Sequence, residues 1–282
     1  MIAEHGTARR VIDEHGITSF TVAPDGNRIV YTVQRGADRS AMRIYNIADG
    51  SSKTVLDAPD ERATNPAWSP ANDFIAYERL KRGTNESGAP TIWLAQTDGT
   101  PLGPLALGST GTQPRFSPDA HWLAFLDKQN LIVVSLNGVG RTLAHGVQTA
   151  PAWSPDNSAV AVATMTAAHG SVLQRIDATT GAVTALGESE RAIHALVWPP
   201  DGQHMALATD VAILLIDVAS HSQHQLGTCA STGDDLAWSP DGRQFVRSCA
   251  AASGQAILNM FTTVGDVPPS TVGTGFAPHW AN

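Results

Sequence analysis

Lysine is scarce in this chain. Only three of the 18 basic residues are lysines (Lys53, Lys81 and Lys128), and the arginines are scattered along the sequence. With a net charge of −8 and a pI near 5.6, the chain lacks the basic patch that nucleic-acid binding needs. It also has no run of 18 apolar residues, so the sequence predicts no membrane span.

The common motifs of several enzyme classes are missing as well. There is no Gly-x-Ser-x-Gly and no His-Glu-x-x-His, the motifs of a hydrolase nucleophile and of a metalloprotease zinc site. Gly138-Val139-Gly140 lacks the third glycine of a phosphate-binding loop. We therefore predict no catalytic residue, no resident metal and no cofactor. No window of a dozen residues shows helical spacing with caps, so almost no helix is expected.

One short phrase recurs seven times: an aromatic residue or Val, a small residue, Pro, and then usually Asp and Gly. The copies lie at 22–26, 68–70, 116–119, 153–156, 198–202, 238–242 and 276–278. Pro presets φ, Asp binds the backbone that follows it, and Gly accepts a positive φ, so each copy predicts a tight turn. At Gly242 we predict φ > 0. The prolines are 37 to 48 residues apart, a period typical of four-stranded propeller blades.

Strand patterns flank each turn. Large–small–large runs such as Ile75-Ala76-Tyr77 follow it, and their period of two suits a β-strand. A third strand and a short fourth strand complete most units. The sequence therefore predicts an all-β fold, a β-propeller of four-stranded antiparallel blades forming a single domain over residues 1–282. Six blades are favoured and seven are the alternative. Residues 8–13 are expected to be an outer strand that closes the ring.

The sixth unit has two unusual features. Cys229 and Cys249 are the only cysteines, and both are expected on the same side of that unit, so they can form one disulfide. The alternative is two free, packed thiols. Arg247 stands where the other units carry an apolar residue. Either it pairs with a carboxylate, because an unpaired buried charge is costly, or it lies exposed where the ring closes.

The phrase Ala-Trp-Ser-Pro-Asp-Gly, complete at 237–242, and the large–Ala–aromatic strands of other units, such as Ile75-Ala76-Tyr77, together resemble the TolB-like propeller family. This family is also described as WD-repeat-like PD propellers, and the resemblance covers about residues 19–280. It implies a propeller and an extracytoplasmic location, in the periplasm or at the cell surface. The N-terminus lacks an apolar signal core, which leaves a cytoplasmic location open. For function the resemblance implies a range: binding scaffolds, propeller domains of peptidases and a few lyases.

Strand alternation sorts the loops onto two sides of each blade. On the turn side, the Pro-Asp turn joins the first strand to the second. On the loop side, the first strand begins and the second strand ends, and propellers commonly bind ligands there. We predict ligand-binding residues on the loop side: His15, Arg62, His145, Glu190, Arg191 and His194.

The leading hypothesis is a non-catalytic binding module for a protein or peptide partner. One alternative is a metal-dependent carbohydrate lyase in which His15, His145 and His194 hold a divalent cation; otherwise these are solvated loop histidines. A second alternative is an accessory propeller domain of a larger enzyme or sensor. The sequence predicts nothing about oligomeric state.

Overall fold

A computed structural model describes the chain at residues 2–4, 7–9, 12, 14–82, 88–105, 110–230, 236–239, 241–251, 253, 256–263 and 268–274. The chain divides into two compact units. The first consists of residues 1–128, 132–141 and 281–282, and the second of residues 129–131 and 142–280. The division falls within the third blade. A single domain over residues 1–282 stays a prediction.

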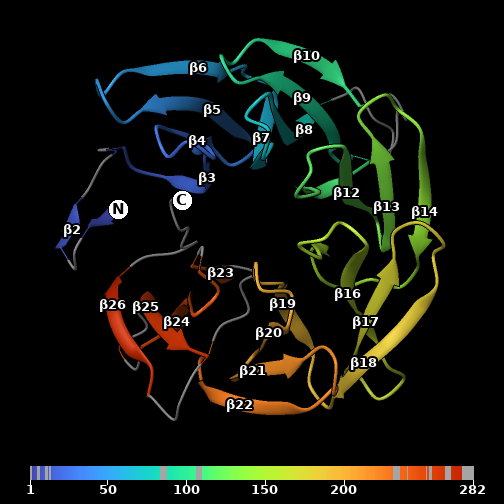
Figure 1. Cartoon of the computed structure of the whole chain (residues 1–282). Coiled ribbons are helices and arrows are strands. Elements are labelled where there is room, and N and C mark those ends of the chain that lie inside the picture. The colour runs from blue at the N-terminus through green and yellow to red at the C-terminus, as the bar shows by residue number, and fades with distance from the viewer. Residues whose placement is uncertain are drawn as a thin grey trace. The chain divides into compact units, whose positions relative to one another are not determined.

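Four consecutive strands, each antiparallel to the next, form each sheet (Figure 1). The first blade consists of β3 (Ile17–Val22), β4 (Arg28–Gly36), β5 (Arg39–Asn46) and β6 (Ser52–Leu56). The second consists of β7 (Glu61–Trp68), β8 (Phe74–Lys81), β9 (Thr91–Gln96) and β10 (Pro101–Pro104). The third consists of β11 (Thr112–Phe116), β12 (Trp122–Asp127), β13 (Asn130–Ser135) and β14 (Gly140–Ala144).

The remaining sheets follow the same order. The fourth blade consists of β15 (Ala152–Trp153), β16 (Ala159–Met165), β17 (Ser171–Asp177) and β18 (Val183–Ser189). The fifth consists of β19 (Ile193–Val197), β20 (His204–Thr209), β21 (Ala212–Asp217) and β22 (Gln223–Thr228). The sixth consists of β23 (Leu236–Trp238), β24 (Gln244–Ala250), β25 (Ala256–Thr262) and β26 (Ser270–Thr274). A separate hairpin pairs β1 (Ile2–Glu4) with β2 (Thr7–Arg9).

The fold class is therefore all-β, a propeller of six four-stranded antiparallel blades, and the described residues contain no helix. This confirms the prediction of six blades rather than seven. In keeping with it, we find no membrane-spanning helix in the described part of the chain. The seventh copy of the phrase, at 276–278, lies outside the described residues.

The outer strand of the sixth blade is β26, and not residues 8–13 as expected. Within that segment, the residues up to 9 belong to β2, which pairs with β1. Of the others, only Ile12 is described, and it is not in a strand. The physical reason is local connectivity: β26 follows β25 after a short connection. Closing a short loop costs less conformational entropy than pairing distant parts of the chain.

The Pro-Asp turns have the chemistry that the phrase predicts. In the sixth blade the Ser239 carbonyl accepts the Gly242 N–H at 2.9 Å, and the Asp241 carboxylate accepts the Arg243 N–H at 3.1 Å. The φ of Gly242 is +69°, as predicted. The same turn position has a positive φ in the other blades, at Gly26, Asn72, Ala120, Asn157 and Gly202.

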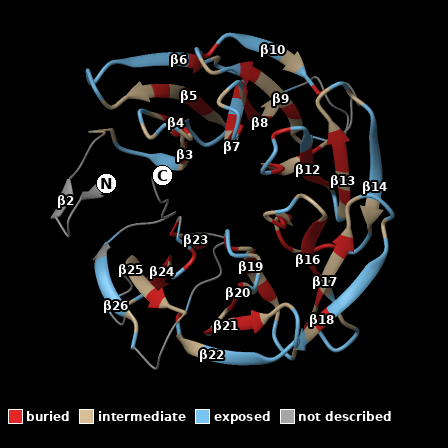
Figure 2. Ribbon diagram, in the orientation of Figure 1, coloured by how far each residue is buried: buried red, intermediate tan, exposed pale blue. Residues whose placement is uncertain are grey.

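Apolar side chains pack between neighbouring blades of each unit. In the first unit, Val30 of β4 lies in one cluster with Ile75 and Tyr77 of β8. In the second unit, Phe245 and Phe261 of the sixth blade stack with centroids 5.1 Å apart, against residues of the fifth blade. Burying each such side chain contributes about 1.5–3 kcal/mol. Figure 2 shows many buried residues on the second strands β8, β12, β16 and β20, whereas β18 and β22 are mostly exposed.

The first strand of a blade is called its inner strand, and in the second to sixth blades a hydrogen bond links the start of this strand to the preceding blade. The N–H of the residue that leads into the inner strand donates to the preceding blade, near the start of its third strand. The acceptor is a backbone carbonyl or a serine hydroxyl. The pairs are Ala63 to Ser40 Oγ, Gly111 to Pro90 O, Val147 to Gln129 O, Ile193 to Ser171 Oγ and Cys229 to Val211 O, all at 2.8–2.9 Å.

Candidate functional site

On the turn side, the aspartates of the repeated phrase are engaged in their own turns. Each carboxylate accepts the backbone N–H two residues ahead, at 2.9–3.1 Å, in Asp25, Asp119, Asp156, Asp201 and Asp241. The hydrogen bond from the Ser154 hydroxyl, together with those from Ser158, lowers the pKa of Asp156 to about 2. These carboxylates stabilise hairpins and do not form a binding site.

The loop side of the second unit carries four of the predicted ligand-binding residues. His145 follows β14 and is exposed, with Nδ1 2.7 Å from the Asn130 side-chain oxygen. Glu190 and Arg191 lie between β18 and β19, and both are exposed. The Arg191 guanidinium donates to Asp210 at 2.9 Å, an exposed ion pair of little energetic weight.

His194, the fourth of these residues, is half-buried and lies at a register shift of β19 between Ile193 and Ala195. The extra residue of such a β-bulge is not paired in the regular hydrogen-bond pattern of the sheet, so its side chain points in a different direction. Among the described residues, the side chains of His194 and Glu190 make no hydrogen bond or ion pair with the protein.

The loop side of the first unit carries the other two predicted residues. His15, just before β3, and Arg62, on β7, are exposed, and their side chains also have no partner among the described residues. The carboxylates near them are engaged. Glu14 accepts the Arg35 guanidinium at 2.7 Å and the hydroxyl of Tyr31 at 2.9 Å. Burial is the main cause that raises the pKa of Tyr31.

Glu61 and Arg79 form a second engaged pair that the sequence analysis did not identify. Glu61 is 4% exposed, and its carboxylate accepts two N–H groups of the Arg79 guanidinium at 2.6 and 3.1 Å. The same guanidinium lies 3.9 Å from the ring centroid of Trp93. The strand pattern of the sequence could have predicted this pair, because the two residues lie on neighbouring antiparallel strands, near the ends that meet on the loop side. The pair stabilises the second blade.

Glu78 is a buried carboxylate of β8 that sequence reasoning also missed as a site. It is 5% exposed and accepts three hydrogen bonds, from Thr64 Oγ1 at 2.9 Å, Asn65 Nδ2 at 2.7 Å and the Gln113 N–H at 2.7 Å. The last donor belongs to the next blade. A buried carboxylate is tolerated when hydrogen bonds compensate its desolvation.

The described residues contain no group of three or more His, Cys, Asp or Glu side chains placed to hold a metal ion. His15, His145 and His194 are thus not assembled as ligands in this part of the chain.

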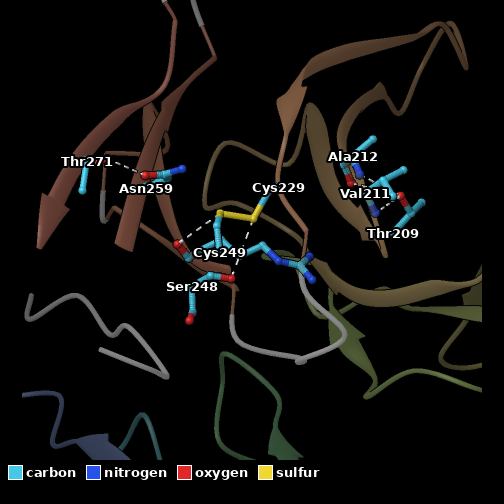
Figure 3. Close-up of a disulfide and its surroundings, with 9 residues drawn as sticks. Thr209, Val211, Ala212, Cys229, Ser248, Cys249, Asn259 and Thr271 are labelled. Carbon is cyan, nitrogen blue, oxygen red and sulfur yellow. Dashed lines mark hydrogen bonds between the residues drawn. A yellow bond between two sulfur atoms is a disulfide. The ribbon is translucent and has the colours of Figure 1, made fainter. Parts of the chain in front are cut away.

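The structure joins Cys229 to Cys249 in a disulfide, the pairing that the sequence favoured over free thiols (Figure 3). The bond connects the segment that follows β22 to β24, and both cysteines are 3% exposed. Next to it, the Ala250 N–H donates to the Ala230 carbonyl at 2.8 Å. The bond therefore fixes the start of the sixth blade on its loop side.

Arg247 on β24 is fully buried. The expectation of an exposed position at the ring closure was therefore wrong. Its place in the large–small–large pattern explains the burial, because the equivalent residues of the other blades are buried too: Tyr31, Tyr77, Phe125, Val162 and Leu207. In register, Arg247 pairs with Leu236 and Asn259.

No protein-family model matches the chain. A curated relative, named an uncharacterized peptidase YuxL of Bacillus subtilis, is 27% identical over 211 residues, which are 70% of this chain and 31% of that protein. The chain thus spans about a third of the length of the curated relative that it matches.

Solved structures show the same fold. TolB from Acinetobacter baumannii aligns with a TM-score of 0.64 and 23% identity, covering 92% of this chain and 67% of that one. A putative TolB from Agrobacterium tumefaciens has a TM-score of 0.64 and 18% identity over 86% of this chain and 92% of that one. An oligogalacturonate lyase in complex with manganese has a TM-score of 0.71 and 15% identity, over 89% and 78%. These likenesses support a TolB-like propeller.

Proposed function

We propose that this protein is a non-catalytic binding module that presents the loop side of its blades to a protein or peptide partner. One observation carries the proposal. On the turn side, the aspartates of the repeated phrase accept hydrogen bonds within their own turns. On the loop side, four charged or ionisable side chains have no partner among the described residues. These side chains belong to His15, Arg62, Glu190 and His194.

The binding side is built on a rigid base. The inner strands of the second to sixth blades are hydrogen-bonded to the blade before them, and in the sixth blade a disulfide adds a covalent link. A surface whose backbone is already ordered loses little conformational entropy when it binds a partner. Charged and polar groups on such a base can therefore recognise an exposed segment of another protein.

We place the protein outside the cytoplasm, in the periplasm or at the cell surface. Disulfides persist in oxidising compartments and are rare in the cytosol, and the cysteines of this chain are joined. The fold shared with TolB proteins points in the same direction. Cell fractionation with an antibody against the chain tests the location, and recovery in the cytosolic fraction would exclude it.

The proposed binding side is tested with a random peptide library displayed on phage and panned on the immobilised chain. The dissociation constant of a selected peptide is then measured by fluorescence anisotropy. Alanine at His145 and His194 together should weaken binding about tenfold or more, a loss of about 1.4 kcal/mol or more. The control changes two turn-side histidines, as H221N with H224A; asparagine suits position 221 because its φ is +60°.

The control variant should bind like the wild type. Weakened binding in the turn-side variant, together with normal binding in the loop-side variant, would place the site on the other side of the blades. Failure of the library to yield any peptide that binds would count against the proposed function itself.

A second candidate function is that of an accessory propeller of a peptidase or another large enzyme. The similarity to a stretch covering 31% of a protein named as a peptidase favours it. An immunoblot of the native organism distinguishes the two. A product near 29.6 kDa, the mass of this chain, supports an independent module, and a much larger product supports the accessory role.

The lyase alternative has the fold likeness to the manganese-bound oligogalacturonate lyase in its favour. It is tested by adding manganese and oligogalacturonate to the purified protein and following the formation of unsaturated products by ultraviolet absorbance. Product formation that is lost when His145 and His194 are replaced would favour the lyase over the binding module.

A further inference from the structure

Two residues of the first unit have a left-handed backbone at the same place in consecutive inner strands. Asn65 on β7 has φ +47° and Gln113 on β11 has φ +55°. Each lies three residues before the aromatic residue of its phrase, each precedes a proline, and each sits at a register shift of its strand. A positive φ is uncommon for residues other than glycine, and the position before proline is restricted further. Other interactions must therefore hold Asn65 and Gln113 in the left-handed conformation.

Each of the two N–H groups donates to a polar side chain of the preceding blade. The Asn65 N–H donates to Ser19 Oγ at 3.1 Å, and that hydroxyl lies 2.6 Å from Thr32 Oγ1. The Gln113 N–H donates to Glu78 Oε1 at 2.7 Å. Hydrogen bonds to a charged acceptor contribute more than neutral ones, so Glu78 is the stronger of the two anchors.

The other blades supply an internal comparison. Glu78 is the fourth residue of the run that begins Ile75-Ala76-Tyr77. The equivalent residues are Leu126 in the third blade and Ala163 in the fourth. Neither side chain can accept a hydrogen bond. The residues that correspond to Gln113 in the following blades, Ala150 and Ala195, do not have a positive φ. Ala150 also precedes a proline, so proline alone does not impose the left-handed conformation.

We propose that Glu78 is a positioning residue that sets the geometry of a partner-binding edge in the first unit. Its carboxylate accepts the Gln113 N–H and so holds that backbone in the left-handed conformation. It also accepts a hydrogen bond from Asn65 Nδ2, which fixes the Asn65 side chain. Both residues are half-buried, on β7 and β11, the strands that form the unpaired inner edges of their sheets.

The role of the edge rests on the proposed function. The Asn65 Nδ2 group donates to Glu78, and the side-chain oxygen of the same amide is an acceptor that matches a peptide N–H. Asn65, held in place by Glu78, is therefore suited to bind the main chain of a peptide partner at this edge. The alternative is that Glu78 only stabilises the junction between two blades.

The experiment compares amide hydrogen exchange at Gln113 in the wild type and in three variants. E78L introduces the residue type found at the equivalent position of the third blade and removes the acceptor. Exchange at Gln113 should become about 10- to 100-fold faster, as expected for loss of a hydrogen bond to a charged group. E78Q keeps an oxygen acceptor and should restore most of the protection. E61L is the matched control, because it removes another buried carboxylate from the same blade.

E78T is the second variant in case E78L does not fold, because threonine stands at the equivalent position of the first blade, as Thr32. It is too short to replace the carboxylate, so it should also accelerate exchange at Gln113. Unchanged exchange in E78T or E78L, or an equal acceleration in E61L, would overturn the positioning role.

The same variants are then tested for binding of the peptide selected from the phage library. The proposal expects at least tenfold weaker binding in E78L, partial recovery in E78Q and no change in E61L. Normal binding by an E78L protein whose Gln113 exchange is fast would reject the role of this edge. If no library peptide binds any form of the protein, the proposed function fails, whereas the exchange measurement still decides whether Glu78 positions Gln113.

Discussion

At the scale of single residues, the left-handed backbone position of the Pro-Asp turn is filled in three ways. Glycine occupies it in the first, fifth and sixth blades, asparagine in the second and fourth, and Ala120 in the third, with φ +61°. Glycine adopts this region without strain and asparagine tolerates it, whereas alanine meets a steric penalty. The turn therefore persists in the third blade because its hydrogen bonds outweigh the strain, with the Ser117 hydroxyl 2.5 Å from Asp119.

Replacing Gly242 by valine should lower the free energy of unfolding by about 1 kcal/mol or more, because a β-branched residue is strained at φ +69°. A Cβ at this position would come no closer than 3.8 Å to Asp201, so the cost arises from the backbone and not from a clash. Urea denaturation measures it. The matched variant A120G places glycine where alanine is already strained, and it should not destabilise the protein. An unchanged midpoint for G242V would refute the strain argument.

At the scale of elements, the sixth blade begins differently from the others. Its inner strand β23 has three residues, and the residue that bonds to the preceding blade, Cys229, lies nine positions before Trp238. In the second, third and fifth blades this distance is five positions. The disulfide to Cys249 links the beginning of this longer connection covalently to the second strand of the same blade.

Removing the disulfide by C229A with C249A should lower the free energy of unfolding by about 3 kcal/mol in the chain-entropy model, for a link between residues 20 positions apart. Chemical denaturation of the variant and the wild type gives the difference. The presence of the bond is checked separately by alkylation without prior reduction, followed by mass measurement. If both thiols are alkylated, the bond is absent and the argument for an oxidising compartment loses its main support.

At the scale of the whole molecule, aspartates dominate the electrostatics of the turns. The pKa is lowered in the folded state for Asp25, Asp49, Asp98, Asp119, Asp156, Asp177, Asp217 and Asp241. A carboxyl group with a lower pKa in the folded state stabilises the protein at pH values above its unfolded pKa. This stabilisation is lost as the pH falls through the folded pKa.

The protein should therefore lose stability in acid, between the unfolded pKa of 3.8 and about pH 2, the folded pKa of Asp156. Thermal unfolding at a series of pH values measures the loss. D156A serves as the internal check: it should be less stable than the wild type at pH 7, and the difference should shrink toward zero near pH 2. A difference that stays constant from pH 7 to pH 2 would mean that the charge of Asp156 does not contribute.

The sequence by itself determined the blade repeat and its turns. Pro, Asp and Gly act on the backbone within five residues of each other, and strand alternation is visible in a few residues more, so both can be read locally. These signals predicted six four-stranded blades, the positive φ of Gly242 and the pairing of Cys229 with Cys249, and the structure agrees with them.

Only the tertiary structure decided which polar residues are engaged. Glu78 meets Gln113 across 35 positions, and Arg247 is fully buried although an exposed position suits a charged side chain better. The last outer strand is β26 rather than residues 8–13, because pairing depends on which segments the folded chain brings together. Contacts between blades join residues from different repeats, so the residue pattern within one repeat cannot predict these contacts. The sequence therefore predicted a candidate site on the loop side of the blades, but it could not separate the engaged side chains of that side from the unengaged ones.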